Sequence, residues 1–527
     1  MRVPKQLKRL TMCVVLLALL LPIGQASPGV AQEAKILVQA IPTDVNTLDP
    51  AEMTSGIDWK PVGHIFDTLV RYDMQLKVTP HVAKSWELSA DGLQWTFHLR
   101  DDVKFHDGTP LDAEAVVFTF ERVYNQEHPF HQYGTWDNWS WYMYMVDKVE
   151  AVDKYTVRFI LKYPYTPFLD TLANFATAIV SPAAYQEKKD KFRIEPVGSG
   201  PFKFVEWQKG DRIVLARNPD YFLGAPKLDE VIYRVIPENT ARLSALKTGE
   251  VHVMSEVSPE IAEVVRQTEG LQLFTQPGLN LGWLRFNMVP ELPGYIKPFG
   301  DRRVREAFIR AIDRKALLDA FFKGYGTIED NPVPSVVWGR DESLKLPEFD
   351  PAKARQLLKE AGYPDGFKVE FWPYMDVRAY QPQPTQLSEA IQAYLKDIGI
   401  EVDIRQVEYG IWWDTVTTGK AQMHTSGWTG DFNDPDNFLF PNWEDSTTGF
   451  SFGWRNEEFA NLLKQAQQES DHDKRVQLYQ KAQKIFFDEL PGMPLFSGMY
   501  IAAVSNKVVD FAMRPDGEIW YAKVDMQ

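Results

Sequence analysis

The sequence predicts an α/β protein that is built from more than one structural unit. Residues 385–397 carry apolar side chains at helical spacing and lead directly into the alternating, strand-like segment 398–404. A helix that passes straight into a strand is typical of α/β folds. Strand-like and helix-like segments also alternate along the chain without a short repeat. The length of 527 residues exceeds the roughly 250–300 residues at which a single core stops growing.

Two strands are predicted in the first third of the chain. Residues 94–105 alternate between apolar and polar side chains, which predicts a half-buried strand whose apolar face carries Trp95, Phe97 and Leu99. Asp107-Gly108 is a turn signal after it, and residues 155–161 predict a second strand.

Helices are predicted from their end signals and their periodicity. Asp350-Pro351 has the order of an N-cap followed by proline at the first helical position, and Gly362 ends that helix. Segment 303–323 predicts two helices, with Asp313 as the cap of the second. Two amphipathic helices are predicted over 456–469 and 474–489.

The first 31 residues have the order of a secretory signal peptide. Residues 1–9 carry four basic and no acidic side chains, Leu10 to Ile23 is an apolar run, and small residues follow it. The run is shorter than the roughly 20 residues that span a bilayer. We therefore predict cleavage after Ala31 and a location in the periplasm. Cleavage after Ala26 and a retained membrane anchor are the alternatives.

Composition excludes several classes of function. Cys13, the one cysteine, lies early in the apolar run, whereas a lipid-attachment cysteine lies at its end. We therefore expect no lipoprotein, no disulfide and no cysteine-based zinc site. Removing the signal takes away four basic and no acidic residues, so the net charge goes from −15 to −19. This acidic balance argues against nucleic-acid binding, and no other apolar run predicts a membrane span.

Three common catalytic or cofactor-binding motifs are absent. The sequence contains no H-E-x-x-H, P-loop or G-x-G-x-x-G motif. His128 and His131 have the spacing of metal ligands on a helix, but Pro129 disfavours that helix, so we predict a loop with partly exposed imidazoles. We interpret Asp434-Pro435-Asp436 as a turn or capping element. The sequon at Asn138 matters only if the source glycosylates. We expect no enzyme, no metal and no cofactor.

Ordered blocks over essentially the whole mature chain resemble one family. Segment 79–108 is similar to the signature stretch of the extracytoplasmic solute-binding proteins of peptide and nickel ABC importers. The similarity continues through six further blocks: 197–202, 218–222, 301–305, 311–314, 357–363 and 427–431.

Within this family the sequence most resembles dipeptide-binding proteins, on the blocks 54–56, 128–131, 277–280 and 427–437. The resemblance implies that Asp431 holds the peptide ammonium and that Arg378 holds the peptide carboxylate. An aspartate offers acceptors to an ammonium, and the arginine fork matches a carboxylate. The candidate substrate-binding residues are Asp431, Arg378, Tyr380, Gly427, Trp428, Thr54, Ser55 and Gly56.

The resemblance also implies a two-lobed periplasmic-binding-protein fold of the large peptide-binder type. Lobe one would comprise 32–75, 196–287 and 494–527, with a subdomain inserted at 76–195, and lobe two would comprise 288–493. Crossing strands near 284–287 and 495–496 would form the hinge. The expected protein is a monomeric receptor that closes on a short peptide and delivers it to a membrane permease.

Simpler interpretations of the same residues stay open. Asp431 can cap a turn, Arg378 can form a surface ion pair, and the aromatic stretch 133–145 (YGTWDNWSWYMYM) can be core or a pocket, with core favoured. We favour core positions for Trp412 and Trp413. The alternative cargoes are an oligosaccharide, an opine, glutathione, haem or a metal chelate. A hydrolase and a chaperone-like protein are the other classes considered.

Overall fold

A computed structural model of the chain describes residues 34–136, 143–444 and 452–527. Residues 35–527 form one compact unit. The predicted signal peptide and the sequon at Asn138 lie outside the described residues. Within the described ranges, no helix combines the length and the apolar character that crossing a membrane requires.

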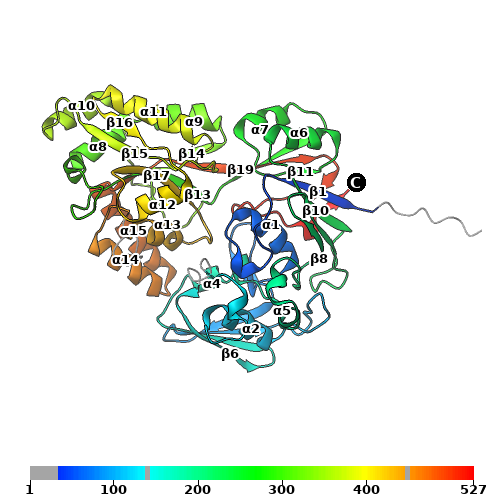
Figure 1. The fold of residues 1–527 in the computed structure, drawn as a ribbon. Coiled ribbons are helices and arrows are strands. Elements are labelled where there is room, and N and C mark those ends of the chain that lie inside the picture. The colour runs from blue at the N-terminus through cyan, green and yellow to red at the C-terminus, as the bar shows by residue number, and fades with distance from the viewer. Residues whose placement is uncertain (1–33, 137–142, 445–451) are drawn as a thin grey trace, which may run out of the picture. The chain divides into compact units, whose positions relative to one another are not determined.

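The largest sheet has eight strands and contains the first strand of the described chain, β1, and the long strand β19 near its end (Figure 1). Its order is β12 (Leu271–Pro277), β19 (Phe496–Ser505), β11 (Val253–Met254), β1 (Ile36–Ile41), β10 (Glu230–Val235), β9 (Arg212–Arg217) and β8 (Phe202–Gln208), and β14 (Gly326–Ile328) pairs with β19. β1 is parallel to β10 and β11, and β19 is antiparallel to its neighbours. Helices α6 (Asn239–Thr248) and α7 (Pro259–Arg266) pack beside β11 and β12, and α1 (Gly56–Ile65) contacts β8.

A four-stranded antiparallel sheet lies between the first and second parts of the eight-stranded sheet in the sequence. Its order is β4 (Ala83–Leu88), β5 (Gln94–Leu99), β7 (Thr156–Leu161) and β6 (Val146–Asp153). Helix α2 (Ala113–Tyr124) packs on β6 and β7, with α4 (Phe168–Thr171) and α5 (Pro182–Lys188) after the sheet. The apolar face predicted for residues 94–99 is confirmed, because Trp95, Phe97 and Leu99 are buried.

The predicted strand 94–105 is too long. β5 ends at Leu99, because the Arg100 amide turns to the carbonyl of Val82 and Lys104 forms an isolated bridge with Pro110. The second predicted strand, 155–161, matches β7.

The third sheet has five strands, in the order β16 (Glu401–Ile404), β15 (Lys368–Trp372), β17 (Met423–Thr429), β13 (Asn280–Phe286) and β18 (Gly492–Pro494). The helices of this part are α8 (Arg302–Ala311), α9 (Arg314–Phe322), α10 (Pro351–Glu360), α11 (Pro384–Asp397), α12 (Tyr409–Thr417), α13 (Pro435–Trp443), α14 (Glu457–Gln468) and α15 (His472–Glu489). Two short ribbons pair β2 (Val70–Tyr72) with β3 (Val78–Pro80) and β20 (Val508–Val509) with β21 (Asp525–Met526). Single 3₁₀ turns cover 50–52, 131–133, 175–177, 189–193, 297–300 and 521–523.

The predicted helix ends are confirmed by their hydrogen bonds. The Asp350 carboxylate accepts from the Lys353 amide at 2.9 Å and begins α10, and the Asp313 carboxylate accepts from the Ala316 amide at 2.9 Å and begins α9. The predicted helices over 456–469 and 474–489 match α14 and α15, and α11 leads into β16 as the sequence predicts.

Strands β13 and β19 cross where the five- and eight-stranded sheets meet. All seven residues of β13 are buried, and Leu495, just before β19, donates its amide hydrogen to the Gly282 carbonyl at 2.8 Å. The largest buried apolar cluster contains residues from each of the three larger sheets, among them Phe97, Val231 and Leu281. The predicted lobe boundaries stay a prediction.

Candidate functional site

Asp431 lies in the loop between β17 and α13, and Asn437 organises it. The Asn437 side-chain oxygen accepts from the Asp431 amide at 2.9 Å and from the Trp428 indole at 3.0 Å, while its amide nitrogen donates to the Asp431 carboxylate at 3.3 Å. Asn437 is buried in the first turn of α13. Two candidate residues, Asp431 and Trp428, are therefore held by a third that the candidate set did not include.

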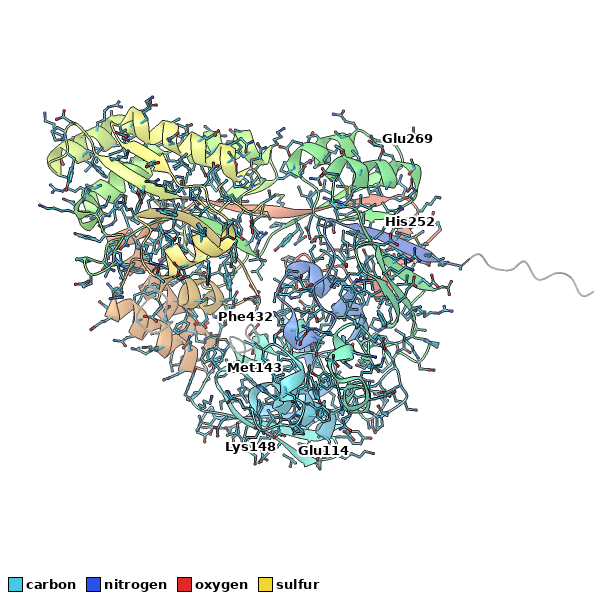
Figure 2. The ribbon with its side chains drawn as sticks, viewed as in Figure 1. Glu114, Met143, Lys148, His252, Glu269 and Phe432 are labelled. Carbon is cyan, nitrogen blue, oxygen red and sulfur yellow. The ribbon has the colours of Figure 1, made fainter. Side chains whose placement is uncertain are left out.

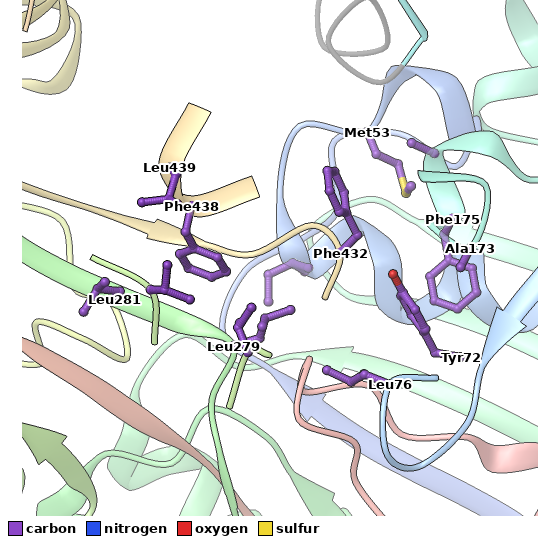
Figure 3. Packing of buried hydrophobic residues seen from close by; sticks show 14 of the residues in the cluster. Met53, Tyr72, Leu76, Ala173, Phe175, Leu279, Leu281, Phe432, Phe438 and Leu439 are labelled. Atoms are coloured by element: carbon purple, nitrogen blue, oxygen red, sulfur yellow. The ribbon is translucent and has the colours of Figure 1, made fainter. Parts of the chain in front are cut away.

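The same loop reaches residues from the N-terminal half. The Asn174 side chain donates to the Asp431 carbonyl at 3.2 Å, and the Asn433 amide donates to the Tyr72 hydroxyl at 3.3 Å. Phe432, labelled in Figure 2, belongs with Met53 to one buried cluster, and Figure 3 shows these side chains coming from the loop after β17 and from the segment before α1. The loop that carries Asp431 is thus seated against the N-terminal part of the chain.

Arg378 is partly buried and partly exposed, and local partners orient its side chain. Its guanidinium donates to the Tyr374 hydroxyl at 2.7 Å and to the Val377 carbonyl at 3.2 Å. The ion pair with Asp376 is long, at 3.4 Å, and the two side chains are 45% and 48% exposed. Burial lowers the pKa of Arg378, but the neighbouring phenol oxygens of Tyr374 and Tyr380 and the Asp376 carboxylate more than offset this, so its pKa is raised.

Tyr380 and Gly427 are brought into contact by packing. Gly427 of β17 is paired with Gly282 of β13, and the Tyr380 ring covers this pair. A Cβ atom at Gly427 would lie 2.4 Å from the ring, and one at Gly282 would lie 2.9 Å from it. Burial, the largest influence, raises the pKa of Tyr380, so the phenol is neutral and available as a hydrogen-bond donor at ordinary pH.

An aromatic group that the candidate set omitted adjoins Arg378. The Tyr374 ring packs against Trp412 and Tyr409, and Tyr409 is near-parallel to Trp412 and Trp413. The core prediction is confirmed for Trp412, which is 5% exposed, and is wrong for Trp413, which is 38% exposed. Consecutive helix residues point about 100° apart, so α12 turns only one of the two indoles towards the sheet.

Thr54, Ser55 and Gly56 lie at the N-terminus of α1, where the backbone amides of Thr54 and Ser55 are occupied in capping. The buried Asp58 carboxylate accepts from the amides of Thr54 and Ser55, each at 3.1 Å. The Thr54 hydroxyl accepts from the Asn46 side chain at 3.1 Å. These contacts are local, so the structure ties this block to α1 rather than to Arg378.

The Asp434-Pro435-Asp436 element is a cap, as predicted, and also part of a buried charged cluster. Asp434 accepts from the Asp436 amide at 2.9 Å at the start of α13 and pairs with Arg475 at 2.9 Å. The Asp436 carboxylate accepts from the Tyr165 hydroxyl at 3.1 Å and from the Gln467 side chain at 3.0 Å. Burial, followed by the nearby Asp434 charge, raises the pKa of Asp436 to about 7.

The histidine pair and the aromatic stretch behave as structural elements. His128 accepts from the Phe130 amide at 3.3 Å, and the His131 ring contacts the Arg122 carbonyl at 3.2 Å. Both are half-buried in a loop and a 3₁₀ turn, as predicted. Across the described ranges of the chain, no group of three or more His, Cys, Asp or Glu side chains is placed to hold a metal ion.

In the stretch 133–145, Met143 and Met145 are buried core residues, Tyr144 is partly exposed, and Trp136 donates to the His131 carbonyl at 2.9 Å. Residues 137–142 lie outside the described residues. The described aromatic side chains, Tyr133, Trp136 and Tyr144, are half-buried or exposed, so the core interpretation of the stretch stays a prediction.

Comparisons with known proteins agree over most of the chain. The family model for bacterial extracellular solute-binding proteins, family 5 (middle), matches residues 77–450. The dipeptide-binding protein of Escherichia coli (strain K12) is 30% identical over 515 residues, which cover 94% of this chain and 95% of that protein. Heme-binding protein A of Haemophilus influenzae is 32% identical over 490 residues, covering 89% and 88%. The crystal structure of a dipeptide-binding protein from Pseudoalteromonas sp. SM9913 in complex with Met-Leu superposes with a TM-score of 0.80 at 27% identity, covering 94% of this chain and all of that one.

Proposed function

Because the chain belongs to the bacterial extracellular solute-binding proteins of family 5, we propose that it captures dipeptides or other short peptides and delivers them to the permease of an ABC importer. The chain has the two-lobed α/β fold of periplasmic peptide-binding proteins, as its sequence predicted. The relatives are binding proteins, and in this proposal the chain likewise performs no chemical reaction on its cargo.

The observation that carries the proposal is the packing of the segment after Arg378 against β17, the strand that leads to Asp431. Tyr380, two residues after Arg378, packs on Gly427, and Asp431 follows Gly427 by four residues. Four extended residues span at most about 14 Å, which limits how far Asp431 lies from the point where the Tyr380 ring meets β17. The proposal places the two charges at the two ends of one short peptide. A zwitterion then finds a partner for its ammonium in Asp431 and one for its carboxylate in Arg378.

The ion pair between Arg378 and Asp376 is weak enough for a cargo carboxylate to replace it. An exposed ion pair contributes roughly 0–1 kcal/mol, and the Arg378–Asp376 contact is both long and nearly half exposed. A charge-assisted hydrogen bond to a buried ligand carboxylate contributes about 1.5–3 kcal/mol. The Tyr374 hydroxyl keeps the guanidinium oriented before the cargo arrives, which lowers the entropic cost of binding.

Transport in this proposal depends on a conformational change. The ligand contacts both lobes and binds the closed form more tightly than the open form. It therefore shifts the population towards the closed form by the free energy of the contacts that only the closed form provides. The loop that carries Asp431 contacts Asn174 and Tyr72 of the N-terminal half of the chain. These contacts support a role for this loop in the proposed closure of one lobe on the other.

Isothermal titration calorimetry tests the proposal with Met-Leu, its N-acetyl derivative and its C-terminal amide. We expect the wild type to bind the free peptide most tightly. Asp431→Asn and Arg378→Gln should each weaken that binding by roughly 10- to 150-fold, the equivalent of one charge-assisted hydrogen bond. Asp473→Asn, a change of a carboxylate that is 94% exposed on α15, serves as the control. No heat from any dipeptide, or unchanged binding in Asp431→Asn, would rule out the peptide proposal.

A second candidate keeps the fold and changes the cargo to a planar or non-peptide solute. The observation in its favour is the aromatic group of Tyr374, Tyr409, Trp412 and Trp413 beside Arg378, in which Tyr409 is 51% exposed. Ring faces suit flat ligands, and one relative is named a heme-binding protein. Mass spectrometry of the ligand that co-purifies with the protein separates the two cargo classes directly.

We further propose a periplasmic, monomeric protein without a lipid anchor. The order of basic, apolar and small residues in 1–31 supports export and cleavage. N-terminal sequencing of the mature protein should begin at Gln32, and sedimentation should give one mass near that of a single mature chain. A lipid-modified N-terminus or a dimer mass would contradict these expectations.

A further inference from the structure

Residues 378–381 form a tight turn that closes on itself. The Arg378 amide donates to the Gln381 carbonyl at 3.2 Å, and the Gln381 amide donates to the Arg378 carbonyl at 2.9 Å. Ala379 and Tyr380 therefore occupy the corner of the turn. The Gln381 side chain donates to the Tyr374 carbonyl and ties the turn to the chain before it. Any displacement of the corner is consequently passed to Arg378.

The corner rests on three glycines from three different strands. A Cβ atom on Gly282 of β13 or on Gly427 of β17 would lie 2.9 or 2.4 Å from the Tyr380 ring. A Cβ atom on Gly498 of β19 would lie 1.8 Å from the Ala379 carbonyl oxygen. None of these positions admits a side chain while the turn stays in place, so the turn packs directly on bare backbone.

Gly498 is itself fixed at the strand crossing by Asn280. The Asn280 side chain donates to the Gly498 carbonyl at 2.9 Å and accepts from the Gly498 amide at 2.9 Å. The Ser497 hydroxyl donates to the Asn280 carbonyl at 2.6 Å. Asn280 is fully buried at the start of β13, which belongs to the five-stranded sheet, whereas β19 belongs to the eight-stranded sheet. If a side chain is added at position 498, the hydrogen bonds to Asn280 hold Gly498 in place on the side away from the turn. The turn of residues 378–381 is therefore the part that must move.

We propose that Gly498 is a positioning residue that sets Arg378 relative to the crossing of β13 and β19. This inference rests on the proposed function, because it assigns Gly498 a part in recognising the cargo carboxylate through Arg378. Binding groups must be held within about 0.5 Å of their productive geometry. A side chain at position 498 displaces the Ala379 carbonyl, and with it the adjacent guanidinium, by more than that margin.

The test compares Met-Leu with its C-terminal amide in the mature protein. The quantity measured is the affinity for free Met-Leu divided by the affinity for its C-terminal amide. In Gly498→Ala we expect this ratio to fall at least tenfold, to the value that Arg378→Gln gives. The double variant should lose nothing further, because both changes act on one interaction. Gly326→Ala is the matched control, because Gly326 faces Gly498 on β14 and a Cβ atom there meets the Phe322 ring rather than the turn. Its affinity ratio should stay that of the wild type, even if its melting temperature falls.

Two outcomes overturn the inference. One is an unchanged affinity ratio in folded Gly498→Ala, and the other is an additive loss in the double variant. If Gly498→Ala fails to fold, Asn280→Ser releases the same glycine from the other side, and an unchanged ratio in that variant overturns the inference equally.

A ligand-free crystal structure of the variant separates this inference from the proposed function. We expect the Ala379 carbonyl and the Arg378 guanidinium to be displaced by more than about 0.5 Å, the margin for a binding site. An unmoved turn contradicts the positioning role whatever the cargo is. A moved turn in a protein that binds no dipeptide retains the positioning role and rejects the peptide.

Discussion

The Tyr165 hydroxyl donates a 3.1 Å hydrogen bond to the buried carboxylate of Asp436, 271 positions away in the sequence. Tyr165 follows β7 of the four-stranded sheet, and Asp436 lies in the first turn of α13, directly after the loop that carries Asp431. The contact therefore joins the four-stranded part of the chain to the element that supports the candidate ammonium site.

The raised pKa of Asp436 predicts a pH-dependent stability. The pKa is about 7 in the folded protein and about 3.9 in an unfolded chain. Between these values the folded state holds a proton that the unfolded state has lost, so this residue makes the free energy of unfolding fall as the pH rises from about 4 to about 7. Asp436→Asn removes the titration, and urea unfolding at pH 5, 6.5 and 8 should show the wild type losing stability relative to this variant.

The titration of Asp436 can lower the free energy of unfolding by at most roughly 1.4 kcal/mol per pH unit. Asp170 and Glu518, whose pKa values burial also raises to about 7, are present in both proteins and cancel in the comparison. Asp473→Asn, on the surface of α15, should give a curve parallel to the wild type. Parallel curves for Asp436→Asn as well would contradict the prediction.

Asn437 should control the ammonium end of the candidate site. Asn437→Asp places a second carboxylate 3.3 Å from that of Asp431 and removes the donor that now faces it. The two carboxylates repel at this distance, and the repulsion displaces the Asp431 carboxylate from the position that Asn437 now holds. We therefore expect the affinity for free Met-Leu to fall at least tenfold in calorimetry. Asn437→Ser, which adds no charge, should lose less. Equal losses in the two variants would show that charge is not the cause.

Gly427 should tolerate no side chain, because the Tyr380 ring covers it and the Leu281 carbonyl oxygen lies 2.7 Å from the position of a Cβ atom. Gly427→Ala forces a Cβ atom to within 2.4 Å of the Tyr380 ring, and overpacking of this kind costs about 1–3 kcal/mol. Urea unfolding should show this loss in the single variant and a smaller effect of the same change in a Tyr380→Ala background. Gly56→Ala, where nothing lies within 4 Å of the new atom, should change the stability by less than about 0.5 kcal/mol. If the stability losses of Gly427→Ala and Tyr380→Ala simply add in the double variant, the result would argue against the contact between the two residues.

Arg122 and Asp49 form a buried ion pair that should be essential to stability. Two guanidinium nitrogens donate to the two carboxylate oxygens, each at 2.8 Å, and both side chains are at most 2% exposed. Arg122→Met leaves the carboxylate buried without its cation, which costs about 3–5 kcal/mol. Asp319→Asn breaks the exposed Lys315–Asp319 pair and should cost less than about 1 kcal/mol. Chemical denaturation measures both, and similar losses would refute the distinction.

Local patterns determined the elements of this protein, because the interactions that form them lie within a few residues. Asp350 and Asp313 cap helices through amides three positions away, and the alternation at Trp95, Phe97 and Leu99 marks the buried face of β5. Capping and periodicity need no knowledge of the rest of the chain. The same locality explains why the predicted strand ran past Leu99, because the amide that ends β5 turns to Val82 on another segment.

The sequence by itself determined the α/β class, the helix ends and, through family resemblance, the pairing of Asp431 with Arg378 as candidate cargo contacts. Only the tertiary structure decided that Asn437 holds Asp431 and Trp428 together, that Arg378 stands on a turn packed against Gly498, and that Trp412 is buried while Trp413 is exposed. The physical reason is the distance along the sequence over which the interactions act. Packing against a bare glycine or burial of a carboxylate beside Tyr165 depends on which distant segments the fold brings into contact, and no spacing within one segment records it.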